Sequence, residues 1–176
     1  MRKLSFSDSE KVFYIADTHF GHYNIIHHCN RPFKDEKEMD TILMNNWNSV
    51  VHPDDNIVII GDFSFKGTRT EEFISKLNGK KYLVLGNHDN PNMEGFMGKY
   101  DMVLVKHQGK IIHCCHYPIT EWYNYFRGSY HFYGHIHNAE NRAAEIMDTL
   151  PGAFNVGADI LGFTPRTADE IIYKKY

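Results

Sequence analysis

Short hydrophobic runs recur along the chain, and their length and composition are typical of β-strands. They are rich in β-branched and aromatic residues, and they lie at residues 12–16, 57–60, 82–85, 102–105, 111–115, 130–133 and 153–156. Each run is far shorter than the ~20 apolar residues that a membrane-spanning helix requires. The pattern therefore predicts a globular protein built on β-sheets, with no membrane partner.

Two helices are predicted between the first three of these runs. In residues 37–51 the apolar positions recur on one face of a helix. Further along, Thr68 and Glu71 have the spacing of a capping box, and Gly79 is suited to end the helix that follows. The resulting order βαβαβ implies parallel strands joined by right-handed crossovers.

The second half of the chain has shorter connections between its hydrophobic runs, which favours hairpins over crossovers. Helices are expected around residues 120–126 and 140–150. We therefore expect a sheet that begins parallel and ends mixed.

Polar side chains follow several of the predicted strands at the point where each strand ends. The segments are Asp17-Thr18-His19, Gly61-Asp62, Gly86-Asn87-His88-Asp89, His116 and Gly134-His135-Ile136-His137. Because the carboxyl ends of parallel strands lie at one edge of a sheet, loops that leave this edge can converge. The sequence thus predicts one site built from five strand ends.

The ligand types in these segments are suited to divalent transition metals. Apart from His88 and Asp89, the segments provide two Asp carboxylates, one Asn carbonyl and four imidazoles, a mixed nitrogen and oxygen set without a thiolate, which suits Mn, Fe, Zn, Ni or Co. Seven ligands exceed the need of one ion, but two ions that share one carboxylate would use them all. Asp62 is the expected bridge because it follows the central strand of the first three. Glycines at 61, 86 and 134 would let the backbone approach the ions closely.

The composition limits the number of domains, the possible partners and the cellular location. The 176 residues fit one domain spanning 1–176, and 12 of them are histidines, the residue type most used for metal binding and proton transfer near neutral pH. A formal charge of −3 gives no overall basic charge for binding a nucleic-acid polymer, although it leaves a local basic patch open. Three cysteines without a CxxC spacing, and a start without a signal-peptide pattern, favour the cytoplasm.

The order DTH, GD, GNHD, His and GHIH, from Asp17 to His137, resembles the signature segments of the calcineurin-like metallophosphoesterase superfamily. The segment DTHFGH resembles small bacterial and phage members that lack accessory domains. This resemblance implies an α/β fold in which mixed β-sheets pack as an α/β/β/α sandwich. It also implies a hydrolase that contains two divalent ions, with manganese favoured, and that cleaves a phosphoester with a metal-bridging hydroxide.

The resemblance also implies a role for each matching residue. The first ion would be bound by Asp17, His19 and His137. The second ion would be bound by Asn87, His116 and His135. Asp62 would bridge the two ions. His88 would act at the leaving oxygen, and Asp89 would orient it. Phe65 stands where purple acid phosphatases of this superfamily have a tyrosinate ligand, so no tyrosinate-to-iron colour is expected.

Other residues are assigned more weakly. His22, Asn24 and Arg31 lie in the connection after the first strand and are candidates for contacts with substrate. His22 could instead contact a metal ligand, and an arginine can equally extend over a helix surface. Six histidines are neither at a strand end nor at position 22, and we expect these six to be structural.

Three functions remain open at this point. A small or nucleotide-like phosphodiester is weakly favoured as substrate over a phosphomonoester, because little sequence is present between Asp89 and His116 to form a cap. The second function is a non-enzymatic metal-binding scaffold for protein interactions, which is disfavoured because every signature position is filled. The third is a nuclease acting on polymer, which the net charge disfavours.

Overall fold

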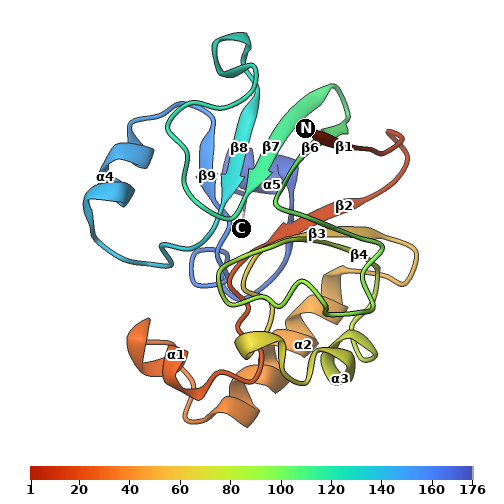
Figure 1. The fold of residues 1–176 in the computed structure, drawn as a ribbon, viewed down its shortest axis with the longest axis vertical. Coiled ribbons are helices and arrows are strands. Elements are labelled where there is room, and N and C mark those ends of the chain that lie inside the picture. Colours follow the sequence, from red (N-terminus) through yellow and green to blue (C-terminus); the bar gives the residue numbers. More distant parts are fainter. Residues whose placement is uncertain (176) are drawn as a thin grey trace.

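The structure is a computed structural model and describes residues 1–175. Its strands are β1 Arg2–Ser5, β2 Val12–Ile15, β3 Asn56–Ile60, β4 Lys80–Val84, β5 Gly98–Tyr100, β6 Met102–His107, β7 Lys110–Cys115, β8 Tyr130–Tyr133, β9 Ala153–Asn155 and β10 Arg166–Thr167. They form two five-stranded sheets, one in the order β1-β6-β7-β8-β9 and the other in the order β10-β2-β3-β4-β5 (Figure 1).

The helices are short except for one. They are α1 Tyr23–His28, α2 Glu36–Val50, α3 Thr70–Ile74, α4 Arg142–Asp148 and α5 Ala168–Tyr173. Among residues 1–175, we find no helix that is both long and apolar enough to cross a membrane. The long helix α2 begins at a capped position, because the Asp35 side chain accepts a hydrogen bond from the backbone of Glu38.

The strands β2 and β3 are buried on both faces and therefore contribute to two cores. On β2, Phe13 and Ile15 pack in one core with Trp47 of α2, whereas Val12 and Tyr14 face the other sheet. This alternation is what a strand with a period of two residues requires when helices cover one face and a second sheet covers the other.

The outer face of the other sheet is covered more thinly. Met147 of α4 packs there against Tyr133 and Ile136. In Figure 1, α4 lies beside β9, on the side of the molecule away from α2 and α3. The layers are therefore helices, sheet, sheet and helix, which confirms the predicted fold class of a single compact α/β domain with two mixed sheets.

The pairing of the strands corrects one prediction for the second half of the chain. The strands β2, β3 and β4 are parallel, as predicted, but β7, β8 and β9 are parallel as well. Within the described part of the chain, only β6 and β7 form the expected kind of antiparallel hairpin. The parallel arrangement matters for the site, because it brings the carboxyl ends of β7 and β8 to the same edge of their sheet.

Two local predictions are also wrong. The Thr68 hydroxyl donates to the carbonyl of Phe65, and α3 begins after Arg69, whose φ of 55° is left-handed, so no capping box forms there. The helix expected at 120–126 is reduced to a 3-10 turn at Tyr125–Arg127, because Asn124 has a left-handed φ of 61° that a helix cannot contain.

Candidate metal centre

Most of the predicted ligands sit in an uncommon backbone conformation. Five of the seven have a φ between 49° and 72°, namely Asp17, His19, Asp62, His135 and His137. Residues other than glycine rarely adopt this left-handed region, although Asp, Asn and His do so more readily than most. Such strain persists only where the surrounding structure enforces it, and it is concentrated at functional sites.

Hydrogen bonds between the loops enforce this conformation. The backbone N–H of Asp17 donates to the carbonyl of Gly61 at 3.0 Å, and that of His19 donates to the carbonyl of Asp62 at 2.9 Å. A Cβ atom at Gly134 would collide with the carboxylate of Asp17. The glycine therefore provides the close backbone approach that the sequence predicts at this position.

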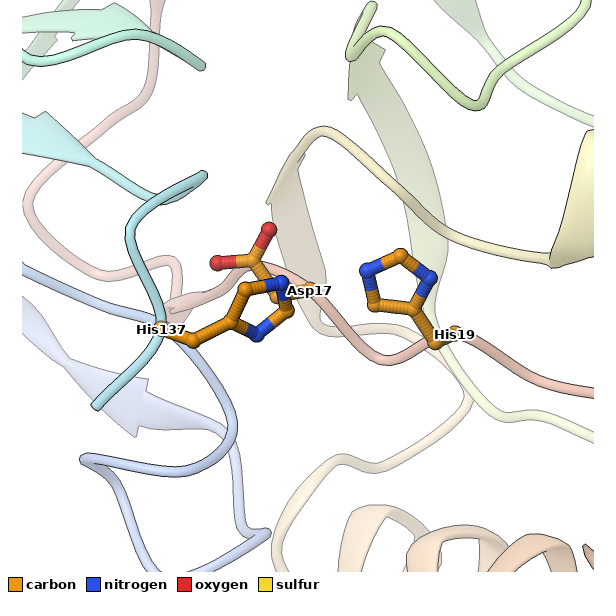
Figure 2. Close-up of side chains that lie close together, drawn as sticks. All are labelled: Asp17, His19 and His137. Carbon is orange, nitrogen blue, oxygen red and sulfur yellow. The ribbon is translucent and has the colours of Figure 1, made fainter. Parts of the chain in front are cut away.

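The first group of ligands consists of Asp17, His19 and His137. Their nearest nitrogen and oxygen atoms all lie within 4.8 Å of one another. Figure 2 shows the carboxylate of Asp17 beside the ring of His137, with the ring of His19 turned toward both. The backbone N–H of His135 fixes the carboxylate by donating to its two oxygens at 3.1 and 3.0 Å.

The second group converges on the carbonyl oxygen of Asn87. This oxygen lies 3.1 Å from Nε2 of His116 and 2.9 Å from Nδ1 of His135. The three residues come from the loops after β4, β7 and β8. The structure thus brings together the residues that the sequence predicts for the second ion.

Asp62 lies between the two groups. Its Oδ2 atom is 3.5 Å from Nε2 of His19 and 3.5 Å from Nε2 of His116. Its other oxygen accepts a hydrogen bond from the backbone N–H of His88 at 2.9 Å. A single carboxylate oxygen therefore faces one imidazole from each group.

One orphaned atom tests whether a metal ion fits this set. Nε2 of His19 is buried and has no hydrogen-bond partner, which is costly for a polar atom unless an ion or water binds it. The nitrogen faces Asp62, the shared carboxylate. The atoms around it are imidazole nitrogens and carboxylate oxygens, which are ligands that divalent transition metals accept. The residues present therefore fit a metal centre.

The two carboxylates differ in pKa. Burial raises the pKa of Asp17 to about 6. Burial acts in the same direction on Asp62, but the hydrogen bond and positive charge of His116 outweigh it and hold the pKa of Asp62 at about 2. The carboxylate between the two groups is therefore ionised at neutral pH and ready to bind cations.

Asp159 supports the first group and was missed from the sequence, where it suggests only a turn. Its Oδ2 lies 2.9 Å from Nδ1 of His137. This contact leaves Nε2 of His137 free for an ion and fixes the orientation of the ring. The signal that could have found Asp159 is its position, since it is a carboxylate four residues after the end of β9, beside the other strand ends.

Arg31 is placed differently from the expected contact with substrate. Its guanidinium is buried and donates to both oxygens of Asp159, at 2.9 and 3.0 Å. It also donates to the backbone carbonyls of Asp17 and Thr18. The structure therefore gives its donors partners within the protein, and its role here is to position Asp159 and the loop that contains Asp17.

A further set of candidate ligand atoms lies behind His137. It consists of Cys29, His137 and Asp159. The guanidinium of Arg31 already binds both Asp159 oxygens, and its positive charge opposes a cation at the same place. We therefore assign Cys29 and Asp159 as supports of His137.

Asp89 holds the loops of the site rather than the ring of His88. Its carboxylate accepts hydrogen bonds from the backbone N–H groups of Gly86, Asp62 and Phe63, at 2.8, 2.8 and 2.9 Å. These three bonds replace the expected contact with His88. Because they tie the loop after β4 to the loop after β3, Asp89 positions Asp62 between the two groups.

The remaining predicted residues, His88, His22 and Asn24, lie around the two ligand groups or on the surface. The ring of His88 is partly exposed and lies 5.2 Å from that of His19, outside both ligand groups. His22 is buried and lies 5.9 Å from His88, measured between ring centroids. Asn24 is exposed on α1, and its contact with substrate stays a prediction.

The pair of His137 and Asp159 predicts a pH dependence for the metal-free protein. Burial alone would lower the pKa of His137, but the hydrogen bond to Asp159 raises it from 6.5 to about 10. The protonated ring thus stabilises the fold fully below about pH 6.5, and this contribution is lost as the pH rises through about 10. We expect the thermal midpoint of chelator-treated protein to fall by several degrees over this range.

The matched variant is Asp159→Asn, in which the slope of the thermal midpoint against pH should be smaller. The loss of a partner for Arg31 will also lower the midpoint at every pH, so the slope is the relevant quantity. A slope equal to that of the wild type, measured by calorimetry in the same chelating buffers, would contradict the assigned pair.

Comparisons with known proteins find relatives in Methanocaldococcus jannaschii and in a mycobacteriophage. It is 30% identical over 165 residues to the uncharacterized protein MJ1445 of Methanocaldococcus jannaschii, covering 92% of this chain and 89% of the relative. It is 37% identical over 85 residues to the gene 66 protein of Mycobacterium phage L5, covering 46% of this chain and 41% of the phage protein. No family model matches.

A solved structure agrees with the fold. The crystal structure of the protein of unknown function AQ665 from Aquifex aeolicus is similar to this chain with a TM-score of 0.76 and 29% sequence identity. The similarity covers 96% of this chain and all of the other.

Proposed function

The chain belongs to the same family as the uncharacterized protein MJ1445, and we propose that it is a metallophosphoesterase of the calcineurin-like type that depends on two divalent ions. The observation that carries this proposal is the position of Asp62. One of its oxygens lies 3.5 Å from an imidazole nitrogen of each ligand group, as a carboxylate shared by two ions requires. The proposal is also supported by the unpaired, buried Nε2 of His19.

In this proposal the seven predicted ligands divide between two ions. Asp62 is common to both, and the separate sets are Asp17, His19 and His137 for one and Asn87, His116 and His135 for the other. When bound, such ions supply positive charge for the phosphate oxygens and lower the pKa of a water molecule toward neutrality. Manganese is the favoured metal, because oxygen and imidazole ligands without a thiolate suit it.

The chain itself supplies a proton donor for the leaving group. His88 is outside both ligand groups, yet its ring is only 5.2 Å from that of His19, between centroids. Its backbone N–H is tied to Asp62, which fixes where the side chain begins. As water attacks phosphorus and the ester P–O bond breaks, His88 donates its proton to the departing oxygen. Since the ring is partly exposed, it regains a proton from solvent.

The size and charge of a cleft beside the ligand groups, which two of the proposed ligands line, favour a phosphodiester of modest size. A cleft of about 730 Å³ opens beside His135 and His137 and is bounded by residues 28–30 and 138–141. The described residues that line it include no lysine or arginine, and Arg31 is engaged with Asp159. A diester group has one negative charge where a monoester has up to two, so it needs less compensation from side chains.

Reconstitution with single metals tests the proposal. Chelator-treated protein should hydrolyse bis-p-nitrophenyl phosphate after addition of Mn²⁺, and it should turn over p-nitrophenyl phosphate more slowly. Zn²⁺, Ni²⁺ and Mg²⁺ are compared separately, and the chelated protein is the control. If the protein binds two ions but cleaves neither compound with any metal, a metal-binding scaffold is the correct reading.

A further inference from the structure

His22 is an additional histidine at the metal centre that the ligand sets do not use. Its Nδ1 lies 3.2 Å from Nδ1 of His19, and both rings are buried. Its ring stacks on that of Phe65, with centroids 4.3 Å apart and an interplanar angle of 29°. The stacking and the hydrogen bond together hold His22 in one orientation.

The two nitrogens of His19 face different partners. Nδ1 faces His22, whereas Nε2 faces Asp62 at 3.5 Å and has no hydrogen-bond partner. A neutral imidazole has one protonated nitrogen and one with a free electron pair, and only the latter binds a metal ion. If Nε2 is the ligand atom, the proton of His19 must be on Nδ1, pointing at His22.

A hydrogen bond between two imidazole nitrogens needs one donor and one acceptor. With the proton of His19 on Nδ1, Nδ1 of His22 has to be the acceptor, and the proton of His22 has to be on Nε2. We propose that His22 is a positioning residue that accepts this hydrogen bond and thereby fixes His19 in the tautomer that presents Nε2 to the first ion.

His137, the other histidine proposed for the first ion, also has a hydrogen-bonding partner at Nδ1, but this partner is not an imidazole. His137 contacts a carboxylate at Nδ1, that of Asp159, at 2.9 Å. Partners of this kind orient a ligating imidazole, and their loss typically weakens metal binding by about 10–100-fold. His22 serves His19 in this way without adding a negative charge beside Asp17 and Asp62.

Two amide variants separate this role from simple packing. The Oδ1 of asparagine can occupy nearly the position of histidine Nδ1, so His22→Asn keeps an acceptor for His19. Glutamine reaches the position of Nε2 instead, so His22→Gln fills the space but leaves Nδ1 of His19 without its acceptor. The inference rests on the proposed metal centre, so wild-type protein is measured alongside each variant.

The experiment is a Zn²⁺ titration of chelator-treated protein against a chromophoric competitor. We expect one of the two sites to weaken about 10–100-fold in His22→Gln and His22→Ala, and to stay within about threefold of wild type in His22→Asn. The control is His27→Gln, a change of an exposed histidine on α1, the helix that begins directly after His22; this variant should bind as the wild type does. Long-range ¹H–¹⁵N spectra of the zinc-loaded protein should show His22 protonated on Nε2 only.

The outcomes distinguish the two proposals. If wild type and all variants bind two ions with equal affinity, the role of His22 is overturned and the metal centre stands. If His22→Asn weakens binding as much as His22→Ala, packing rather than the hydrogen bond explains the effect. Wild-type protein that takes up no ion would overturn the metal centre and the role of His22 with it.

Discussion

Replacing His88 with alanine is expected to lower kcat for a phosphodiester whose leaving group is a weakly acidic alkyl alcohol by about 10²–10⁴-fold, the usual contribution of a general acid. The metal content should stay at that of the wild type, because the side chain of His88 lies outside both ligand groups. Its structural link to Asp62 runs through its backbone N–H, which alanine retains. The two quantities to measure are kcat and the number of ions per chain in the same preparation.

His88→Asn is the matched control, because it keeps a polar side chain without a group that exchanges protons near neutral pH. It should be nearly as slow as His88→Ala. The leaving group offers a second control. The variant should lose less activity on an ester with a strongly acidic alcohol, since such an alcohol needs little protonation to depart. An equal loss for acidic and weakly acidic leaving groups would contradict the proton-donor role.

Replacing Asp62 with asparagine is expected to have the largest effect on the metal centre. The amide removes the negative charge that faces both groups, so we expect the bound metal to fall from two ions to one or none. Removing charge stabilisation of several kcal/mol corresponds to a loss of activity on the order of 10³-fold or more. Metal analysis after gel filtration, together with kcat/KM, measures both effects.

Asparagine is the informative substitution because it preserves the backbone. Asp62 has a left-handed φ of 53°, a region that asparagine tolerates about as well as aspartate. The carbonyl oxygen of the amide can still accept the hydrogen bond from His88. The variant should therefore fold, with a far-ultraviolet circular dichroism spectrum like that of the wild type. A folded variant that retains two ions would show that Asp62 is not the shared ligand.

The fold was largely predictable because hydrophobic periodicity specifies the central strands. The run at 57–60 is buried on both faces as β3, and the run at 12–16 forms its parallel neighbour β2. The parallel pairing of β7, β8 and β9 was not predicted, because the connections at residues 116–129 and 134–152 have little hydrophobic periodicity, although both are long enough for a parallel return. Short edge strands such as β10, of two residues, have no periodicity to detect.

The clustering of the candidate ligands was predictable because these residues directly follow strands that strong hydrophobic patterns reveal. The residues that support the ligands were not, because a supporting contact depends on the geometry of loops distant in sequence. Arg31 and Asp159 are 128 positions apart and form a buried ion pair. Asp89 was expected to orient a neighbouring ring, but three backbone N–H groups compete for its carboxylate and occupy it.

The most direct test of the two-metal account is a titration of metal-free protein with Mn²⁺ while hydrolysis of bis-p-nitrophenyl phosphate is followed. The account predicts that activity rises with added metal and reaches its maximum at two equivalents per chain. Maximal activity at one equivalent, or no activity when two ions are bound, would contradict it.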